Sequence, residues 1–346
     1  MSTLVVRLDS LGDVLLAGPA VRAAATGPDP VVMLCGPQGA PAARLLPGVD
    51  EVLVWDAPWV SVPAPPVRRA DVLRTVTAIA RHRPSRALVL TSFHQSPLPT
   101  ALVLRLAGVP WIAADSTDYP GSLLDLRHRR APGRHEAEAA LDLAEAAGFR
   151  LPTGDDGALR TLPPPDTRPL TGPEPYVVVH PGSAAPARAP GTALAAEAVE
   201  ALAESGRRVV VTGHPGERAL TAAVSGRHGT DLGGATDLPG LAGVLAGADA
   251  VVAGNTGPAH LAAAVGTPVV SLFAPVVPAW RWRPYGVPCV LLGRQDAPCA
   301  DTRARVCPVP GHPCLSGLTG SDIAAAVERL LAESPRAHPD LRAVIP

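Results

Sequence analysis

Three short segments of the sequence place glycines beside hydroxyl, imidazole or carboxylate side chains in spacings suited to a phosphorylated ligand. The most informative is Gly254-Asn255-Thr256-Gly257-Pro258-Ala259-His260, which follows an apolar run. Glycine at 257 lets a ligand approach the backbone closely, and proline at 258 suits the first position of a helix. The free N–H groups at that helix start, with the Thr256 hydroxyl, predict a phosphate site, and His260 falls about one turn further on near the same mouth.

The other two segments are His180-Pro181-Gly182-Ser183 and Thr212-Gly213-His214-Pro215-Gly216-Glu217. A small-residue loop such as Gly182-Ser183 can wrap N–H groups around a phosphate, and the nearby Arg188 can clamp a diphosphate. Glu217 can accept hydrogen bonds from ribose hydroxyls. Each feature has a structural alternative: an ordinary loop, a solvated arginine and a helix cap. The convergence of three glycine-bearing loops on one sheet edge is a stronger signal than any single loop.

A carboxylate stands at a comparable position near the start of the chain, in Arg7-Leu8-Asp9-Ser10-Leu11-Gly12-Asp13. Gly12 permits a tight turn, and Asp13 falls at or near the start of a helix, where the anionic carboxylate is favoured. An anionic carboxylate there could take a proton from a hydroxyl as a general base. The alternative is a simple helix cap, which is the commoner use of aspartate at this position.

Two further clusters contain side chains suited to binding an anion or a metal ion. The basic loop Arg127-His128-Arg129-Arg130 could hold an anionic acceptor or be a solvated turn. Cys299, Cys307 and Cys314, with a nearby histidine, invite a zinc site. We predict no metal, because structural zinc sites usually contain a compact Cys-x-x-Cys pair and none is present.

The elements that position these segments follow an α/β pattern, with β-branched apolar runs alternating with alanine-rich helical stretches. Expected strands are 3–8, 31–35, 51–54, 87–91, 176–180, 208–212, 250–253, 268–273 and 288–292. Expected helices are 14–25, 41–46, 69–81, 99–106, 135–147, 192–204, 217–225, 238–246, 258–265 and 320–332. Parallel strands connected in this way predict ligand sites at the carboxyl edge of the sheets.

Length and composition predict two domains. The chain has 346 residues, 47% of them hydrophobic, and a net charge of −1, which argues against a nucleic-acid partner. We expect an N-terminal Rossmann-like domain at 1–160, a proline-rich linker at 161–175, a C-terminal Rossmann-like domain at 176–333 and a loose tail at 334–346.

Composition also bears on where the protein works. The chain contains arginine and no lysine, and its many alanines, glycines and prolines are typical of a GC-rich bacterial genome. The opening apolar run is too short for a signal segment, and no stretch is long enough to span a bilayer. The prediction is a cytoplasmic protein without a transmembrane segment, and peripheral membrane contact stays open.

Together, these blocks resemble glycosyltransferase family 9, the ADP-heptose:lipopolysaccharide heptosyltransferase-like enzymes. The resemblance includes a fifth block, Cys314-Leu-Ser-Gly-Leu-Thr-Gly-Ser-Asp-Ile323, before the last helix, and spans most of the chain. It implies a GT-B fold, in which two Rossmann-like domains with parallel sheets face a central cleft. It also implies that the last helix, about 320–333, packs back on the N-terminal domain.

The resemblance assigns roles residue by residue. Asp13 matches the general base. Independently of the resemblance, we place Gly12, Arg127 and Arg130 on the acceptor side, because the basic loop could hold an anionic acceptor. The donor side would be formed by Gly182, Ser183, Arg188, Glu217, Asn255, Thr256, Gly257 and His260. Two departures affect the donor side: the family often has aspartate where this chain has Asn255, and often a lysine where Arg188 stands.

The implied reaction is metal-independent, cofactor-free transfer of a heptose-like sugar, with inversion, from a nucleotide diphosphate donor. ADP is the expected nucleotide and Asp13 the expected base, and the acceptor is the hydroxyl of a glycan or a secondary metabolite. A nucleotide-sugar 2-epimerase-like isomerase of the same double-Rossmann design is the alternative, and a non-catalytic binder stays open. A dinucleotide oxidoreductase is disfavoured because 9–13 lacks the Gly-x-Gly-x-x-Gly spacing.

Overall fold

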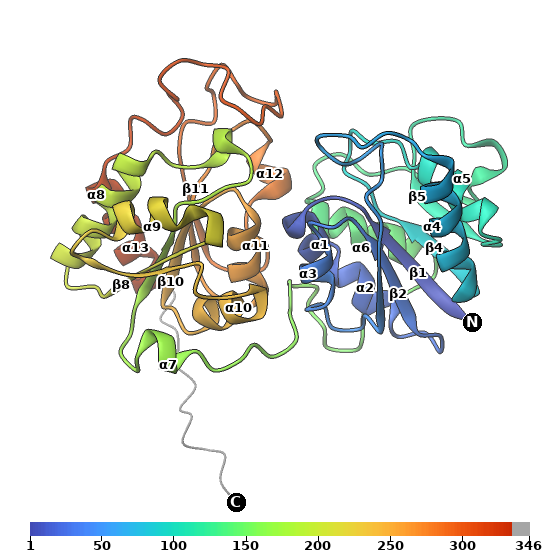
Figure 1. The fold of residues 1–346 in the computed structure, drawn as a ribbon, viewed down its shortest axis with the longest axis horizontal. Helices are drawn as coiled ribbons and strands as arrows, with labels where there is room; N and C mark the ends of the chain where they lie inside the picture. Colours follow the sequence, from blue (N-terminus) through green and yellow to red (C-terminus); the bar gives the residue numbers. More distant parts are fainter. Residues whose placement is uncertain (334–346) are drawn as a thin grey trace, which may run out of the picture.

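The computed structural model describes residues 1–333, which fold into two parallel six-stranded sheets lying side by side (Figure 1). The sheet of the first half has the order β3-β2-β1-β4-β5-β6. Its strands are β1 (Ser2–Arg7), β2 (Val31–Cys35), β3 (Glu51–Val54), β4 (Pro84–Val89), β5 (Ile112–Asp115) and β6 (Leu126–His128). The sheet of the second half has the order β12-β11-β10-β7-β8-β9. Its strands are β7 (Val177–His180), β8 (Val209–Gly213), β9 (Gly229–Gly233), β10 (Ala250–Gly254), β11 (Val269–Leu272) and β12 (Cys289–Leu292).

Helices cover both faces of each sheet because the central strands are apolar on both sides. In β1, Val5 packs with one core cluster while Leu4 and Val6 pack with another, as strand alternation requires. On the Val5 side lie α1 (Leu11–Leu16), α2 (Gly18–Ala24), α3 (Ala40–Ala43) and α6 (Glu136–Ala146). On the other side lie α4 (Arg69–Arg81) and α5 (Leu98–Leu106).

The second half repeats this arrangement. One face of its sheet is covered by α8 (Thr192–Glu204), α9 (Arg218–Ser225) and α13 (Gly320–Glu333). The other face is covered by α10 (Leu238–Ala246), α11 (Gly257–Ala264) and α12 (Ala279–Trp282). Short 3-10 turns are η1 (Gly121–Leu123), η2 (Pro186–Arg188) and η3 (Pro215–Glu217). Among the described residues, no helix is long and apolar enough to cross a membrane.

The two halves meet where α1 faces α11. A Cβ placed on Gly12 would lie 2.7 Å from Cδ2 of His260, and one on Gly257 would lie 2.8 Å from Cδ2 of Leu11. Glycine on both helices therefore allows the close approach. Because α1 follows β1 and α11 follows β10, this contact brings the carboxyl edges of the two sheets together.

The proline-rich segment expected as a linker runs between the two sheets and contains one short helix, α7 (Arg168–Thr171) (Figure 1). The chain entering it is anchored to the first half: the Leu162 N–H donates to the Leu45 carbonyl at 2.7 Å. Arg22 binds both Asp155 and the Ala158 carbonyl at 2.6–3.0 Å. The predicted tail, 334–346, lies outside the described residues.

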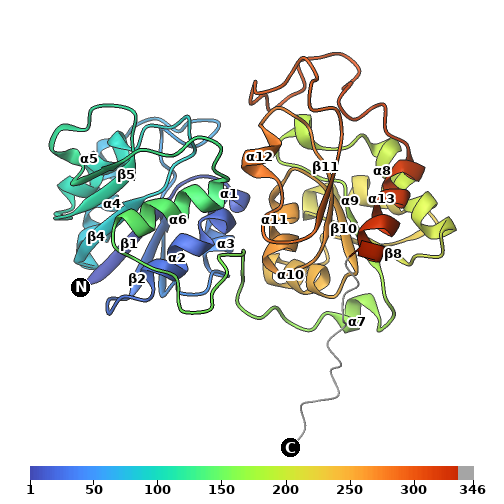
Figure 2. The same ribbon diagram turned by 180° about the vertical axis from the view of Figure 1, so that it is seen from behind.

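The expectation that the last helix packs back on the N-terminal domain is wrong. Helix α13 packs against α8 and the second sheet, on the side away from the first half (Figure 2). Its apolar residues Ile323, Val327 and Leu330 join the cluster that contains Val177 and Val179 of β7. The physical reason is that this face of the second sheet is apolar and α8 alone does not cover it, so α13 buries its own apolar stripe there.

Candidate active site

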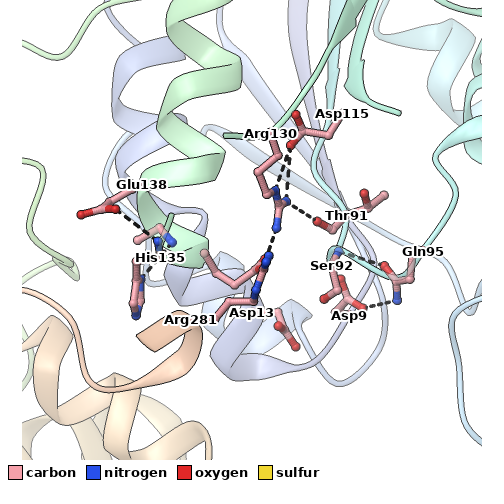
Figure 3. A network of polar contacts seen from close by, with 12 residues as sticks. Asp9, Asp13, Thr91, Ser92, Gln95, Asp115, Arg130, His135, Glu138 and Arg281 are labelled. Atoms are coloured by element: carbon pink, nitrogen blue, oxygen red, sulfur yellow. Dashed lines mark hydrogen bonds and ion pairs between the residues drawn. The ribbon is translucent and has the colours of Figure 1, made fainter. Parts of the chain in front are cut away.

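The loop after β1 builds a buried ionic cluster. Arg7, the last residue of β1, is only 2% exposed, and its guanidinium contacts two aspartates. Its Nε lies 2.8 Å from Oδ2 of Asp9, and its Nη2 lies 3.0 Å from Oδ1 of Asp13. The same Nη2 donates to Ser92 Oγ at 2.9 Å, and Gln95 Nε2 donates to the other oxygen of Asp9 (Figure 3). Because every partner is fixed to the fold, the two carboxylates are held in place.

Asp13 lies in the first turn of α1, as the sequence predicts. Its second oxygen accepts a hydrogen bond from the hydroxyl of Ser10, the residue before the helix, at 2.7 Å. Burial by itself would raise the pKa of Asp13, but Arg7, the Ser10 hydroxyl, Arg188 and His260 together hold that pKa below the usual aspartate value. Asp13 is therefore an anion at neutral pH, and its side chain keeps 19% of its surface exposed.

The second half brings three loops to the same edge. Glu217 closes the η3 turn, where its carboxylate accepts the His214 N–H at 2.8 Å and lies against Gly182. The ring of His180, at the end of β7, meets the Thr212 hydroxyl at 3.0 Å. Burial lowers the pKa of His180 to about 4 despite the opposing charge of Glu217. The predicted donor-side residues Gly182 and Glu217 are thus neighbours, while Ser183 bonds with the backbone of Ala185.

Arg188 and His260 are the donor-side residues that face Asp13. Arg188, at the end of η2, has a buried Nε without a hydrogen-bond partner, and its charge acts on Asp13. His260, in the second turn of α11, is 5% exposed, and its Nδ1 is also buried without a partner. Burial lowers the pKa of His260 to about 4, with the charges of His135 and Arg188 adding to the effect and Asp13 opposing it. Unpartnered buried polar atoms of this kind are suited to a ligand.

The phosphate turn has the predicted backbone. Thr256 is the extended residue before α11, Gly257 begins the helix and Pro258 follows it. Asn255, however, is engaged by the fold: its Nδ2 donates to the Ala274 carbonyl at 3.1 Å, and its Oδ1 accepts the Ala274 N–H at 3.3 Å. An aspartate could not donate to that carbonyl. The amide at 255 therefore holds the backbone that follows β11, and the predicted donor-side role of Asn255 stays a prediction.

The predicted acceptor arginines are also committed to the first half. Arg127 donates to the carbonyls of Ser116 and Thr117 at 3.1 and 2.6 Å, which fixes the loop between β5 and β6. Arg130 contacts Glu136 at 2.6 Å, Asp115 at 3.3 Å and the Thr91 carbonyl at 3.0 Å (Figure 3). Both guanidiniums therefore already hold protein partners, and their predicted acceptor role stays a prediction. Of the predicted acceptor residues, Gly12 lies at the contact between the halves.

The late cysteine-containing segment has a structural role that the sequence reasoning missed. Its Arg305 carbonyl accepts the Ala187 N–H at 2.9 Å, and the Arg305 side chain donates to the Ala184 carbonyl at 2.9 Å. His312 Nε2 meets the Ala187 carbonyl at 3.2 Å. The segment therefore braces the loop that carries Arg188. Within residues 1–333, no group of three or more His, Cys, Asp or Glu side chains is placed to hold a metal ion.

Other functional candidates missed from the sequence are Arg7, Asp9, Glu136 and Arg281. Glu136 begins α6 and is fully buried, yet it contacts Arg130, Arg281 and Arg7 at 2.6, 3.1 and 3.8 Å. Burial raises the pKa of Asp9 to about 6, against the opposing effect of Arg7. The available signal was weak, because a buried glutamate and an exposed one look alike in a single sequence.

Comparison with known proteins agrees with this geometry. The model of glycosyltransferase family 9 (heptosyltransferase) matches residues 95–312. Lipopolysaccharide heptosyltransferase 1 of Pseudomonas aeruginosa is 30% identical over 340 residues, which cover 89% of this chain and 87% of that protein.

Solved structures confirm the predicted GT-B fold. The family 9 glycosyl transferase of Veillonella parvula superposes with a TM-score of 0.75 at 18% identity, covering 96% of this chain and 97% of that chain. The E. coli heptosyltransferase WaaC with ADP superposes with a TM-score of 0.66 at 23% identity, with coverages of 96% and 97%.

Proposed function

The chain belongs to glycosyltransferase family 9 and is a heptosyltransferase-type glycosyltransferase, and from this premise we propose its reaction in finer detail. It transfers a heptose-like sugar, with inversion and without a metal ion, from an ADP-linked donor to a hydroxyl of a glycan or a secondary metabolite. Asp13 is the general base. The observation that carries the proposal is the meeting of Asp13 with Arg188 and His260 where α1 faces α11.

Asp13 is the base because it is the most accessible of the three acids in the cluster. Glu136 has no exposed side-chain surface and Asp9 has 11%, whereas Asp13 has 19%. An anionic carboxylate at the edge of the cleft can accept the proton of an acceptor hydroxyl as that oxygen attacks the anomeric carbon. The attack breaks the bond between the anomeric carbon and the diphosphate oxygen, and the diphosphate leaves from the opposite face of that carbon. A single displacement therefore inverts the sugar.

The departing diphosphate is stabilised by the second half. The start of α11 presents the Gly257 N–H and the positive end of its dipole, while the Ala259 N–H donates to the Thr256 carbonyl at 3.1 Å. Arg188 adds a guanidinium whose buried Nε has no protein partner. These groups supply positive charge where negative charge develops on the leaving group.

The ADP-linked donor is proposed from the relatives, since WaaC of E. coli was solved with ADP and with ADP-2-deoxy-2-fluoro heptose. Glu217, next to Gly182, is the proposed ribose contact. We also propose a cytoplasmic location, and the five cysteines, all free, suit a reducing compartment.

The test begins with thermal shifts in a panel of ADP-, GDP-, UDP- and dTDP-sugars, because binding raises apparent stability by mass action. We expect the ADP-sugars to give the largest shift. Transfer is then measured for the wild type and for Asp13→Asn, with Asp166→Asn in the exposed linker as the matched control. Asp13→Asn should lower kcat by about 10²- to 10⁴-fold while ADP affinity stays within about threefold.

Other outcomes separate the alternatives. Equal losses of kcat and of ADP affinity in Asp13→Asn would reject the general-base role, and unchanged transfer would favour a binding protein. Conversion of the nucleotide sugar without an acceptor would favour the epimerase. Retention of configuration in the product would exclude single displacement. Activity should survive EDTA, and a loss that zinc restores would reject metal independence.

A further inference from the structure

A short segment of the second half reaches across to the first half beside the catalytic cluster, which is formed by Arg7, Asp9, Asp13 and Glu136. Helix α12 lies on the side of the second half that faces α1 and α6 (Figure 1). From it, Arg281 Nη1 reaches Oε1 of Glu136 at 3.1 Å; the arginine side chain is 12% exposed and the glutamate side chain 0%. A salt bridge this well buried is sensitive to the loss of either partner.

Glu136 shares its charge among arginines from both halves. Arg130 and Arg7 come from the first half, at 2.6 and 3.8 Å, whereas Arg281 comes from the second. Arg7 also holds Asp13, with 3.0 Å between Nη2 and Oδ1. A continuous line of charged contacts therefore runs from Arg281 through Glu136 and Arg7 to Asp13.

The Arg281 guanidinium is held in one orientation. Its central carbon lies 4.5 Å from the ring centroids of Phe93, from the first half, and Trp280, from the second. Phe93 also packs against Trp282 at 5.7 Å. Figure 3 shows Arg281 beside Arg130 and His135 at the beginning of α6. Stacking on aromatic faces from both halves favours this guanidinium position when the halves are together.

Neighbouring residues make the same crossing. His135 Nε2 meets the Arg283 carbonyl at 2.9 Å, and the His135 ring stacks on Tyr285 at 4.6 Å between centroids. The Tyr285 hydroxyl lies 3.5 Å from Oε1 of Glu138. The segment 279–285 therefore docks as a unit, and Arg281 is the member that touches the catalytic cluster.

We propose that Arg281 is a positioning residue. It couples closure of the two halves to the pairing of Arg7 with the Asp13 anion, acting through Glu136 and Arg7. This inference rests on the proposed role of Asp13 as the base. When the halves are together, Arg281 neutralises part of the charge of Glu136, so that Arg7 stays paired with Asp13. Without Arg281, Glu136 carries more uncompensated charge and competes for Arg7.

Both consequences act on Asp13 in the same direction. The charged and titratable groups around it are, from the first half, Arg7, Asp9, Glu136 and His94, and, from the second half, Arg188 and His260. Removing a cation from this set disfavours the Asp13 anion, so the pKa of Asp13 rises. A higher pKa moves the acid limb of the kcat/KM profile to higher pH.

The experiment compares Arg281→Met, Arg281→Lys and Glu136→Gln with Tyr285→Phe, which removes a crossing contact without touching Glu136 or Arg7. The pKa of Asp13 is measured by 13C NMR of Asp-labelled protein with saturating ADP, with the signal assigned by its absence in Asp13→Asn. Turnover is followed as ADP release. We expect Arg281→Met to raise the pKa of Asp13 by about 0.5 to 1 and to lower kcat by about tenfold or more.

Each variant has a distinct expected result. Arg281→Lys should lie between Arg281→Met and the wild type, since it keeps the charge and loses the fork. Glu136→Gln removes the competing anion and should lower the pKa of Asp13, the opposite sign, which keeps the test valid if Arg281→Met does not fold. Tyr285→Phe should leave the pKa of Asp13 within about 0.3 of its wild-type value and kcat within about twofold.

An Asp13 pKa unchanged in both Arg281→Met and Glu136→Gln overturns the coupling. A loss of kcat in Tyr285→Phe equal to that in Arg281→Met reduces Arg281 to one contact among several. Asp13→Asn separates the two proposals: if that variant is active, the general-base assignment fails, and if it is inactive while Arg281→Met behaves as wild type, only the coupling fails.

Discussion

The close approach of the two halves at Gly12 makes Gly12→Ala an informative perturbation. A Cβ at this position would lie 2.7 Å from Cδ2 of the His260 ring. His260 is 5% exposed and belongs to the other half, so its ring has little room to move aside. Gly12 itself lies inside α1, where alanine is the better helix former by about 1 kcal/mol. The substitution should therefore not destabilise the first half while it opposes closure.

The size of the effect follows from the overlap. Ordinary carbon–carbon contact needs roughly 3.5 Å, so α1 and α11 must separate by about 1 Å at this point. A misplacement of that size costs about 10²-fold in rate when reacting groups must be aligned. Because the donor loops all belong to the second half, donor affinity should change by no more than about threefold.

The assay measures kcat and KM for transfer, ADP affinity by calorimetry and unfolding by urea. Gly27→Ala is the matched control, since its Cβ would meet only ordinary contacts, the nearest at 3.4 Å from the Ala24 carbonyl oxygen. We expect a kcat loss of about 30- to 100-fold for Gly12→Ala and none for the control. A kcat within twofold of wild type would show that the contact between Gly12 and His260 is not part of the reacting arrangement.

Three more predictions follow from the charges. Arg188→Met should weaken ADP binding by about ten- to a hundredfold, with partial recovery in Arg188→Lys, and unchanged calorimetric affinity would remove Arg188 from the donor site. Arg22→Met should lower the free energy of unfolding in urea by about 1–3 kcal/mol, because Asp155 and the Ala158 carbonyl lose their partner; a loss equal to that of Arg168→Met, at an exposed pair, would contradict this. Burial holds the pKa of four histidines, His94, His135, His180 and His260, at about 4, so the unfolded chain binds more protons below about pH 6.5 and stability falls toward pH 4. Asp9, with a pKa of about 6, offsets one of the four, so we expect the free energy of unfolding to fall by up to about 4 kcal/mol per pH unit near pH 5. Constant stability from pH 7 to 5 would disprove this.

The sequence predicted nine of the twelve strands that the structure describes and missed three. Expected strands at 31–35, 51–54 and 250–253 match β2, β3 and β10 within a residue. β5, β6 and β9 were missed because they are short or polar: β9 is Gly-Thr-Asp-Leu-Gly and shows little apolar signal. The edge strands β3 and β12 were predicted because they are apolar runs, so length and apolar content decided the outcome more than position in the sheet.

The packing of α13 shows a second limit. Its amphipathic pattern predicted a helix over 320–332, and the structure has one over Gly320–Glu333. The pattern says that one face is apolar but does not say which sheet accepts it. The partner was inferred from the resemblance and was wrong, because the open apolar face belongs to the second sheet.

The candidate site was predictable where backbone chemistry decides it. Glycine, threonine and proline in the 254–260 segment predicted the turn before α11, and the structure has that turn. Side-chain roles that depend on distant partners were not predictable. Asn255 bonds to Ala274, nineteen residues along the chain, and Arg130 is neutralised by Asp115 and Glu136. A single sequence does not state those pairings.

The absence of lysine from the chain acquires a physical meaning at Arg7. One guanidinium there serves three carboxylates: Nε faces Asp9, Nη2 faces Asp13 and Nη1 faces Glu136. A lysine ammonium has a single nitrogen and could not hold three acids in separate directions. The fixed fork keeps each carboxylate in place, and a guanidinium does not lose its proton when buried. Since Asp13 must stay anionic and Glu136 must stay available to Arg281, the catalytic cluster depends on the geometry of arginine as much as on its charge.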